Sequence, residues 1–301
     1  MLPASYDGCI ALSDNLSFLR RLPDSSIDLI YIDPPFNTGK AQTRLSLRTV
    51  ADAEAGDRIG FAGKRYRTIQ EAELSYPDAF KNYLDFLRPR LEEARRVLKP
   101  SGSFYFHIDY REAHYCKVFL LDPIFGRENF LNEIVWAYDY GGRARNRWPA
   151  KHDTIFFYAK ERGKHIFNWD EIERIPYMAP GLVTPEKAQR GKVPTDVWWH
   201  TIVGTNSREK TGYPTQKPLG ILRRIIQASS PKGGIVLDFF AGSGTTGMAA
   251  LQLGRRFILV DNHLPALEVM EKRFAEAGAK ILWIGYRPKT QRHRNLFSQE
   301  V

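Results

Sequence analysis

A carboxylate, two prolines and an aromatic ring follow one another at Asp33-Pro34-Pro35-Phe36, directly after an apolar run. The exocyclic amino group of adenine is a poor nucleophile, because its lone pair is delocalised into the ring. Asp33 could accept one N–H of such an amine, and the Pro34 carbonyl, restrained by Pro35, could accept the other. Phe36 could stack on a base swung out of a duplex. In isolation, however, the segment is explained more simply as a rigid turn that ends a strand.

A second segment with chemical potential has two glycines close together in the run Asp238-Phe-Phe-Ala-Gly-Ser-Gly-Thr-Thr246. Glycines let the backbone approach a ligand, and the start of a following helix favours a negatively charged group. Asp261, about twenty residues further on, could bind ribose hydroxyls. The candidate cofactor residues of this segment are Asp238, Phe240, Gly242, Ser243, Gly244, Thr245 and Thr246.

The glycine-rich segment is also compatible with two different roles. Gly242 to Gly247 satisfies the dinucleotide pattern G-x-G-x-x-G, so an NAD-dependent oxidoreductase competes for this segment alone. Against it, dinucleotide-binding strands usually run straight into the first glycine, without an acid and two phenylalanines before it. A glycine-rich turn that binds no ligand is the second alternative.

A third segment, Tyr213-Pro-Thr-Gln-Lys-Pro218, precedes an apolar helix pattern. Pro218 suits the first turn of that helix. The polar side chains of Thr215, Gln216 and Lys217 would then lie beside the glycine-rich turn. Alone, this segment indicates a helix start and nothing more.

Strand and helix patterns alternate around these motifs, which predicts an α/β fold. The expected strands are 26–33, one beginning at Gly102, 234–240 and 257–261. The expected helices are 80–98, 112–121, 219–229, 245–253 and 266–277. A buried parallel sheet accounts for the apolar strands.

Three segments interrupt this rhythm. Residues 138–200 are rich in Trp, Pro and Arg and look like an insertion between two halves of one sheet, 1–137 and 201–286. Residues 37–75 follow the two prolines as a long, charged stretch, expected to be a mobile loop, and such loops are often functional. Residues 287–301 form a basic tail.

The formal net charge of +10 indicates a polyanionic partner such as nucleic acid. Only Cys9 and Cys116 occur, too few for a disulfide scaffold. The sequence has neither a long apolar span nor a signal-peptide pattern, which favours a cytoplasmic protein with no membrane partner. The spacing of His107, Asp109, His114 and Cys116 matches no standard ligand pattern, so we expect no metal site.

Taken together and in this order, the segments DPPF, PTQKP and FAGSGTT resemble the amino-methyltransferases of bacterial restriction–modification systems, in the circularly permuted arrangement called the β subgroup. The resemblance extends over almost the whole chain. Two positions depart from it: Phe36 stands where Tyr is more frequent, and Phe239 where Pro is common. The resemblance implies the Rossmann-like S-adenosylmethionine-dependent methyltransferase fold, a mostly parallel sheet with helices on both faces.

The resemblance also implies roles. S-adenosylmethionine would be the cofactor, bound by the glycine-rich segment, with Asp261 on the ribose, Asp33 near the methyl group and Asp14 near the adenine ring. The methyl acceptor would be adenine N6 in double-stranded DNA, because an acid before the two prolines more often accompanies adenine in this family. Cytosine N4 is the alternative. Residues 138–200 would recognise the target sequence, and the candidate DNA contacts are Lys40, Arg44, Arg143, Arg145, Arg147 and Lys151.

The same resemblance suggests a homodimer, a companion restriction endonuclease and a place at the bacterial nucleoid. Methylation of RNA or of a protein would use the same cofactor segment, so those substrates remain open. A DNA-binding module without catalysis is a further alternative, but the intact DPPF segment disfavours it.

Overall fold

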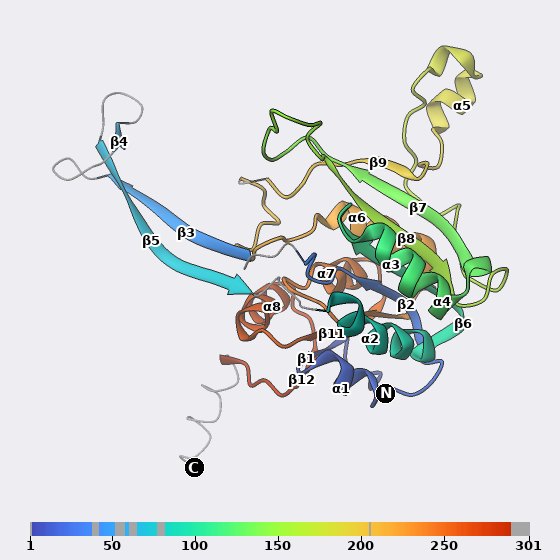
Figure 1. Ribbon diagram of the computed structural model, residues 1–301, viewed down its shortest axis with the longest axis horizontal. Helices are drawn as coiled ribbons and strands as arrows, with labels where there is room; N and C mark the ends of the chain where they lie inside the picture. The colour runs from blue at the N-terminus through green and yellow to red at the C-terminus, as the bar shows by residue number, and fades with distance from the viewer. Residues whose placement is uncertain are drawn as a thin grey trace.

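The computed structural model describes residues 2–37, 42–51, 58–59, 65–76, 82–204 and 206–289. Nine strands form one sheet in the order β12-β1-β11-β10-β2-β6-β8-β7-β9 (Figure 1). Their bounds are β1 Gly8–Leu12, β2 Ile27–Ile32, β6 Leu98–Ile108, β7 Phe130–Ala137, β8 His152–Ala159, β9 Val197–Trp199, β10 Ile235–Asp238, β11 Arg256–Asp261 and β12 Ile281–Ile284.

The sheet is parallel from β12 through β6, and only β8 runs antiparallel to both of its neighbours. β1 lies between β11 and β12, so the start of the chain pairs with its last strands. β2 likewise pairs with β10. The mostly parallel α/β sheet predicted from the sequence is therefore confirmed, and segments 200 residues apart share it.

Helices cover both faces of the sheet, and each face has its own apolar core (Figure 1). One core takes side chains from α1 (Asn15–Leu19), α2 (Tyr83–Val97), α3 (Ala113–Cys116), the π-helical η2 (Lys117–Leu121) and α4 (Asp122–Phe125). The other takes them from α6 (Leu219–Ser229), α7 (Thr245–Gln252) and α8 (Leu264–Glu276). Because every second residue of a strand points to the same face, the buried strands supply both cores.

The region 138–200 is less separate than expected. β8 and β9 both belong to the nine-stranded sheet, and β8 is buried along almost its whole length between β6 and β7. The parts outside the sheet are the β7–β8 connection and residues 160–196, which include η4 (Pro180–Leu182) and α5 (Pro185–Arg190). Figure 1 shows α5 standing away from the sheet.

The region 37–75 contains strands where we expected an irregular loop. β3 (Gln42–Ala51) and β5 (Arg65–Tyr76) form a long antiparallel pair, with the short β4 (Arg58–Ile59) beside β5. The pair extends away from the nine-stranded sheet (Figure 1). Its alternating apolar and polar residues, as in RLSLRTV, are a strand signal that the high charge of the segment obscured.

The remaining element, the 3₁₀ turn η3 (Arg127–Asn129), connects α4 to β7. Of the basic tail, residues 290–301 lie outside the described residues. Among the helices of the described part of the chain, none is long and apolar enough to cross a membrane.

Candidate active site

The central crevice opens between β2 and β10. These neighbouring strands end at the same sheet edge, but β10 leads through α7 to β11 on one side, whereas β2 leads through α2 to β6 on the other. Open α/β sheets bind ligands at such a switch point. A cavity of about 390 Å³ lies there, within the range of small-molecule sites. The predicted segments DPPF, PTQKP and FAGSGTT all contribute to its wall.

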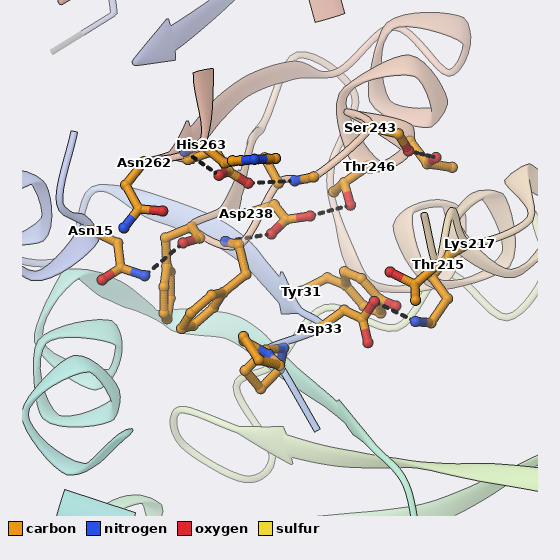
Figure 2. A pocket seen from close by; sticks show the side chains of 18 of the residues that line it. Asn15, Tyr31, Asp33, Thr215, Lys217, Asp238, Ser243, Thr246, Asn262 and His263 are labelled. Carbon is orange, nitrogen blue, oxygen red and sulfur yellow. Dashed lines mark hydrogen bonds and ion pairs between the residues drawn. The ribbon is translucent and has the colours of Figure 1, made fainter. Parts of the chain in front are cut away.

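Asp33 follows the last residue of β2 and faces the cavity (Figure 2). Its Oδ2 atom accepts a hydrogen bond from Lys217 Nζ, in an ion pair between two largely buried side chains. Its Oδ1 atom is buried and has no hydrogen-bond partner among the described residues. A buried acceptor without a partner costs on the order of 1–3 kcal/mol, so this atom indicates a site for a donor from a ligand.

The two prolines and Phe36 complete this wall. Pro34 is buried, and the Pro35 carbonyl accepts a hydrogen bond of 2.6 Å from the Tyr83 hydroxyl on α2. Lys217 Nζ lies 4.9 Å from the centre of the Phe36 ring. The turn is therefore held from α2 on one side and from the 211–218 segment on the other.

The glycine-rich turn supplies the opposite wall. Gly242 lines the cavity with a φ of +50°, and a Cβ atom there would lie 3.3 Å from the Tyr213 ring. Gly244 has a φ of +74° and precedes α7, but it does not line the cavity. A Cβ atom on Gly244 would instead meet Met270 at 2.8 Å, inside the core. The two glycines thus have different tasks, because only Gly242 borders the ligand space.

Asp238 ends β10 fully within the protein. Its oxygens accept hydrogen bonds from the Thr246 hydroxyl at 2.6 Å and from the Phe240 N–H at 3.0 Å (Figure 2). Burial raises the pKa of Asp238 to about 7 despite these two bonds, and the nearby charges of Asp33 and Asp261 add to the rise. Asp238 therefore fixes the turn from within.

Asp261 ends β11 and has a similar arrangement. Its oxygens accept from the Gly242 N–H at 2.8 Å and the His263 N–H at 2.9 Å. Burial raises the pKa of Asp261 as well, opposed by these backbone hydrogen bonds. Asp261 and the neighbouring Asn262 both line the cavity.

The other polar residues of the turn also have partners within the protein. The Arg273 guanidinium on α8 donates to the Ser243 carbonyl and to the Thr245 hydroxyl, both at 3.0 Å. Ser243 Oγ and Thr245 Oγ1 lie 3.1 Å apart. Ser243, Thr245, Thr246 and Phe240, which were predicted to bind the cofactor, line the cavity.

In the 211–218 segment, the side chains divide between the cavity wall and the loop itself. The Gln216 carbonyl oxygen accepts from the Thr211 N–H and hydroxyl, both at 2.8 Å, and its amide donates to the Glu209 carbonyl. Thr215 has a φ of +55°. Thr215, Gln216 and Lys217 all border the cavity, and Lys217 reaches across it to Asp33.

Asp14 lies at the rim, where it caps α1. Its Oδ1 atom accepts from the Ser17 N–H at 2.8 Å, and its Oδ2 atom pairs with Arg90 at 3.1 Å. Burial opposes ionisation of Asp14, but the bonds from Ser17 and Arg90 outweigh it and lower the pKa. Asp14 borders the cavity, but its contacts are those of a residue that caps the N-terminus of α1.

Several cavity residues were missed by sequence reasoning, because nothing in their local pattern indicates chemistry. Asn15 and Arg90 illustrate this: Asn15 donates to the Phe239 carbonyl and accepts from Arg90. The missed lining residues outside the motif segments are Ser13, Asn15, Tyr31, Phe86, Arg90, Arg111, Leu222, Asn262 and His263. Tyr213, Pro214, Phe239 and Ala241 also line the cavity and lie within those segments, but they were not named as candidate site residues.

Four of the candidate DNA-contacting residues lie near the edge of the sheet at which the cavity opens. Arg143, Arg145 and Arg147 are exposed in the β7–β8 connection, which leaves the sheet at the same edge as the cavity because β7 is parallel to β6. Lys151 lies there too, and its ammonium donates to the Gly141 carbonyl. Arg44 belongs to β3, with its side chain outside the described parts, and Lys40 lies outside the described residues.

Comparison with known proteins agrees with this geometry. The family model described as DNA methylase, of the N6/N4 methyltransferases, matches residues 27–272. The chain is 32% identical to the type II methyltransferase M.HpaI of Haemophilus parainfluenzae, over 89% of this chain and 74% of that protein. It is 31% identical to the DNA adenine methyltransferase YhdJ of Escherichia coli, over 89% and 85%.

Among solved structures, the complex of M1.HpyAVI with S-adenosylmethionine has a TM-score of 0.53 at 21% identity, over 88% of this chain and 99% of that one. This likeness supports the fold. The family match covers most of the chain and includes both walls of the cavity. The chain therefore belongs to the N6/N4 DNA methylase family and is a DNA methyltransferase.

Proposed function

We propose that this chain transfers the methyl group of S-adenosylmethionine to the N6 amino group of a flipped adenine at a specific site in double-stranded DNA. The observation that carries the proposal is Asp33 Oδ1, a buried acceptor without a partner among the described residues, in a cavity shared with the glycine-rich turn. An exocyclic amine supplies the missing donor.

The cavity fits the methyl donor on its glycine side. Gly242 leaves room for a ligand close to the backbone, and Asp261 and Asn262 stand where ribose hydroxyls can be bound. Thr245 and Thr246 begin α7, whose N-terminal end favours the carboxylate of the methionine moiety. When bound, S-adenosylmethionine supplies a methyl group made electrophilic by its sulfonium.

On the other wall, Asp33 Oδ1 accepts one N–H of the target amine and the Pro34 carbonyl accepts the other. These two acceptors turn the nitrogen lone pair out of conjugation and toward the methyl group. The nitrogen forms its new bond to carbon as the sulfur–carbon bond breaks, and the Asp33 carboxylate can then take the proton that the nitrogen loses. Phe36 stacks on the flipped base.

Adenine is favoured over cytosine by two observations. An acid, Asp33, precedes the two prolines, and YhdJ, a relative at 31% identity, is a DNA adenine methyltransferase. Each base presents an exocyclic amine beside a ring nitrogen, so the acceptor geometry alone suits both.

The experiment is a transfer assay with labelled S-adenosylmethionine and, in separate arms, duplex DNA, RNA and a peptide. We expect labelled DNA, and digestion of that DNA to nucleosides should give N6-methyladenosine in its deoxy form by mass. N4-methylcytosine would correct the base. Label only in RNA or peptide, or a melting shift with NAD and none with S-adenosylmethionine, would contradict the proposal.

The remaining assignments extend the proposal. The order of DPPF, PTQKP and FAGSGTT supports the β subgroup, and the exposed arginines of the β7–β8 connection support target recognition within 138–200. The strands of 37–75 would contact the DNA as well. A homodimer, to be tested by sedimentation at micromolar concentration, and a companion endonuclease are proposed from the family resemblance.

A further inference from the structure

A series of four hydrogen-bonded polar side chains, three of them buried, crosses the sheet directly beside Asp33. The Tyr31 hydroxyl on β2 lies 2.7 Å from His107 Nδ1 on β6. His107 Nε2 lies 3.1 Å from Asp153 Oδ2 on β8, and the Tyr138 hydroxyl donates to Asp153 Oδ1 at 3.0 Å. His107 is fully buried, and Asp153 is 7% exposed. None of these four residues was predicted to act in the site.

For each hydrogen bond in this series, the donor and the acceptor can be assigned consistently. Asp153 Oδ1 accepts from the Tyr138 hydroxyl, and Asp153 Oδ2 faces His107 Nε2. Burial alone would raise the pKa of Asp153, but the hydrogen bonds that it accepts lower it. An ionised Asp153 can only accept, so a neutral His107 beside it carries its proton on Nε2. His107 Nδ1 is then an acceptor, and the Tyr31 hydroxyl donates to it.

The Tyr31 end of this hydrogen-bonded series lies beside Asp33, the proposed acceptor of the target amine. His107 Nδ1 is 4.0 Å from Asp33 Oδ1, which has no hydrogen-bond partner among the described residues. Tyr31 precedes Asp33 by two residues and borders the same cavity (Figure 2). Burial and then the nearby charge of Asp33 raise the pKa of Tyr31, so its hydroxyl lies within the influence of that carboxylate. The hydroxyl is therefore a candidate donor for Asp33 Oδ1, and it is hydrogen-bonded to His107 instead.

We propose that Asp153 and His107 are positioning residues that hold the Tyr31 proton away from Asp33, so that Asp33 Oδ1 stays free for the amino group of the target base. The inference rests on the proposed function of Asp33. If His107 carried its proton on Nδ1, that N–H would donate to the Tyr31 oxygen. The Tyr31 proton would then be released toward Asp33 and would compete with the base.

The first test measures the tautomer and needs no activity. Nitrogen-15 NMR of the imidazole of His107 in the intact protein should show a neutral ring with the proton on Nε2. In Asp153→Asn, the amide can donate to Nε2, and we expect the proton to move to Nδ1, by the logic of an orienting carboxylate. A ring in the wild-type protein that is doubly protonated at neutral pH, or protonated on Nδ1, overturns the proposal.

The second test is a double-mutant cycle on the single-turnover rate. Asp153→Asn should slow methyl transfer by about 10- to 100-fold, the loss expected when a charged acceptor is occupied by the wrong donor. Its affinity for S-adenosylmethionine, measured by calorimetry, should not change. Tyr31→Phe alone removes the competing hydroxyl and should cost less than about threefold, because His107 and Asp153 remain paired.

The decisive variant combines the two changes. Asp153→Asn with Tyr31→Phe should recover most of the rate lost in Asp153→Asn, because no hydroxyl is left to compete for Asp33. A purely structural network predicts the opposite, a double variant that is slower or less stable than either single variant. Additive or greater loss in the double variant, at an unchanged melting temperature, would therefore overturn the proposal.

Tyr105→Phe is the matched control. Tyr105 is also buried, lies two residues before His107 on β6, and its hydroxyl is 2.7 Å from Ser229 Oγ. This variant loses a comparable hydrogen bond away from Asp33, so its rate should equal that of the wild type. Absence of DNA methylation by the wild-type protein would contradict the proposed function, whereas the tautomer of His107 is measured independently of it.

Discussion

The two walls of the cavity treat their carboxylates differently. On the glycine side, both oxygens of Asp238 and both oxygens of Asp261 accept hydrogen bonds from the protein itself. On the proline side, Asp33 uses one oxygen for Lys217 and leaves the other buried without a partner among the described residues. Every carboxylate oxygen of Asp238 and Asp261 thus has a hydrogen-bond partner before a ligand binds, whereas one oxygen of Asp33 has none among the described residues.

This difference indicates a structural role for the carboxylates of the glycine wall and a chemical role for Asp33. A carboxylate with satisfied oxygens fixes a backbone, and here it fixes the turn that borders the cavity. An unsatisfied buried acceptor raises the energy of the resting protein and is relieved when a donor binds. This contrast agrees with the proposed acceptance of the reacting amine by Asp33, with Asp238 and Asp261 holding the backbone of the turn.

The largest expected effect is on the rate of methyl transfer, in a variant that changes the proline wall and leaves the glycine wall intact. Asp33→Ala removes the acceptor for the amine, and we expect the single-turnover rate to fall by roughly 10³-fold or more. Binding of S-adenosylmethionine, followed by calorimetry, should persist because the glycine wall is unchanged. Full activity in this variant would show that Asp33 is not needed for methyl transfer.

The two glycines provide a sharper comparison within one wall. Gly244→Ala places a Cβ atom against Met270 at a positive φ, which should cost about 1–3 kcal/mol and lower the melting temperature by several degrees. Gly242→Ala carries a similar positive-φ strain, but its Cβ meets the Tyr213 ring at the cavity wall, so this variant alone should also bind S-adenosylmethionine more weakly. Equal losses of stability and affinity in both variants would argue against this division.

The buried acid of the glycine wall predicts a pH dependence of stability. Burial raises the pKa of Asp238 to about 7, so the folded protein holds a proton that the unfolded chain has already lost. Stability from this group is fully present below the unfolded pKa and is lost as the pH rises through about 7, by roughly 1.4 kcal/mol per pH unit at most.

Denaturant unfolding of the ligand-free protein between pH 5 and 8 measures this slope. Asp238→Asn, which does not titrate, should flatten the curve, although loss of one acceptor lowers the stability at every pH. An unchanged slope in this variant would show that another group is responsible.

The smallest expected effect concerns the proposed DNA contacts in the β7–β8 connection. Arg145→Ala should weaken binding to duplex DNA by a few-fold and reduce the dependence of log affinity on log salt by about one, if Arg145 contacts a phosphate. Arg162→Ala is the control, because Arg162 is also exposed but follows β8 at the opposite edge of the sheet. Equal effects of both variants would show a diffuse electrostatic contribution only.

Much of the fold could be predicted from local patterns. The helix at 219–229 and the strands ending at Ile32, Asp238 and Asp261 lie within one or two residues of their expected bounds. They were predictable because each is apolar at a regular spacing and ends at a proline, a glycine or an acid. β1, α1 and β12 were missed because they are short, and β3 and β5 because charge hides their alternation.

The site was predictable in its motifs and not in its contacts. DPPF and the glycine-rich turn could be assigned to one sheet edge because parallel strands end together. The pairing of Lys217 with Asp33 spans 184 residues, and the bonds from Tyr31 through His107 to Asp153 join three strands. Such contacts depend on strand order, which local sequence does not encode.

The most direct measurement is a crystal structure of the protein with S-adenosylhomocysteine and a duplex that contains the methylation target. We predict that the exocyclic nitrogen of a flipped adenine lies within hydrogen-bond distance of Asp33 Oδ1 and the Pro34 carbonyl, while Asp238 and Asp261 keep their present partners. A target amine bound away from Asp33, with Oδ1 still without a donor, would contradict this prediction.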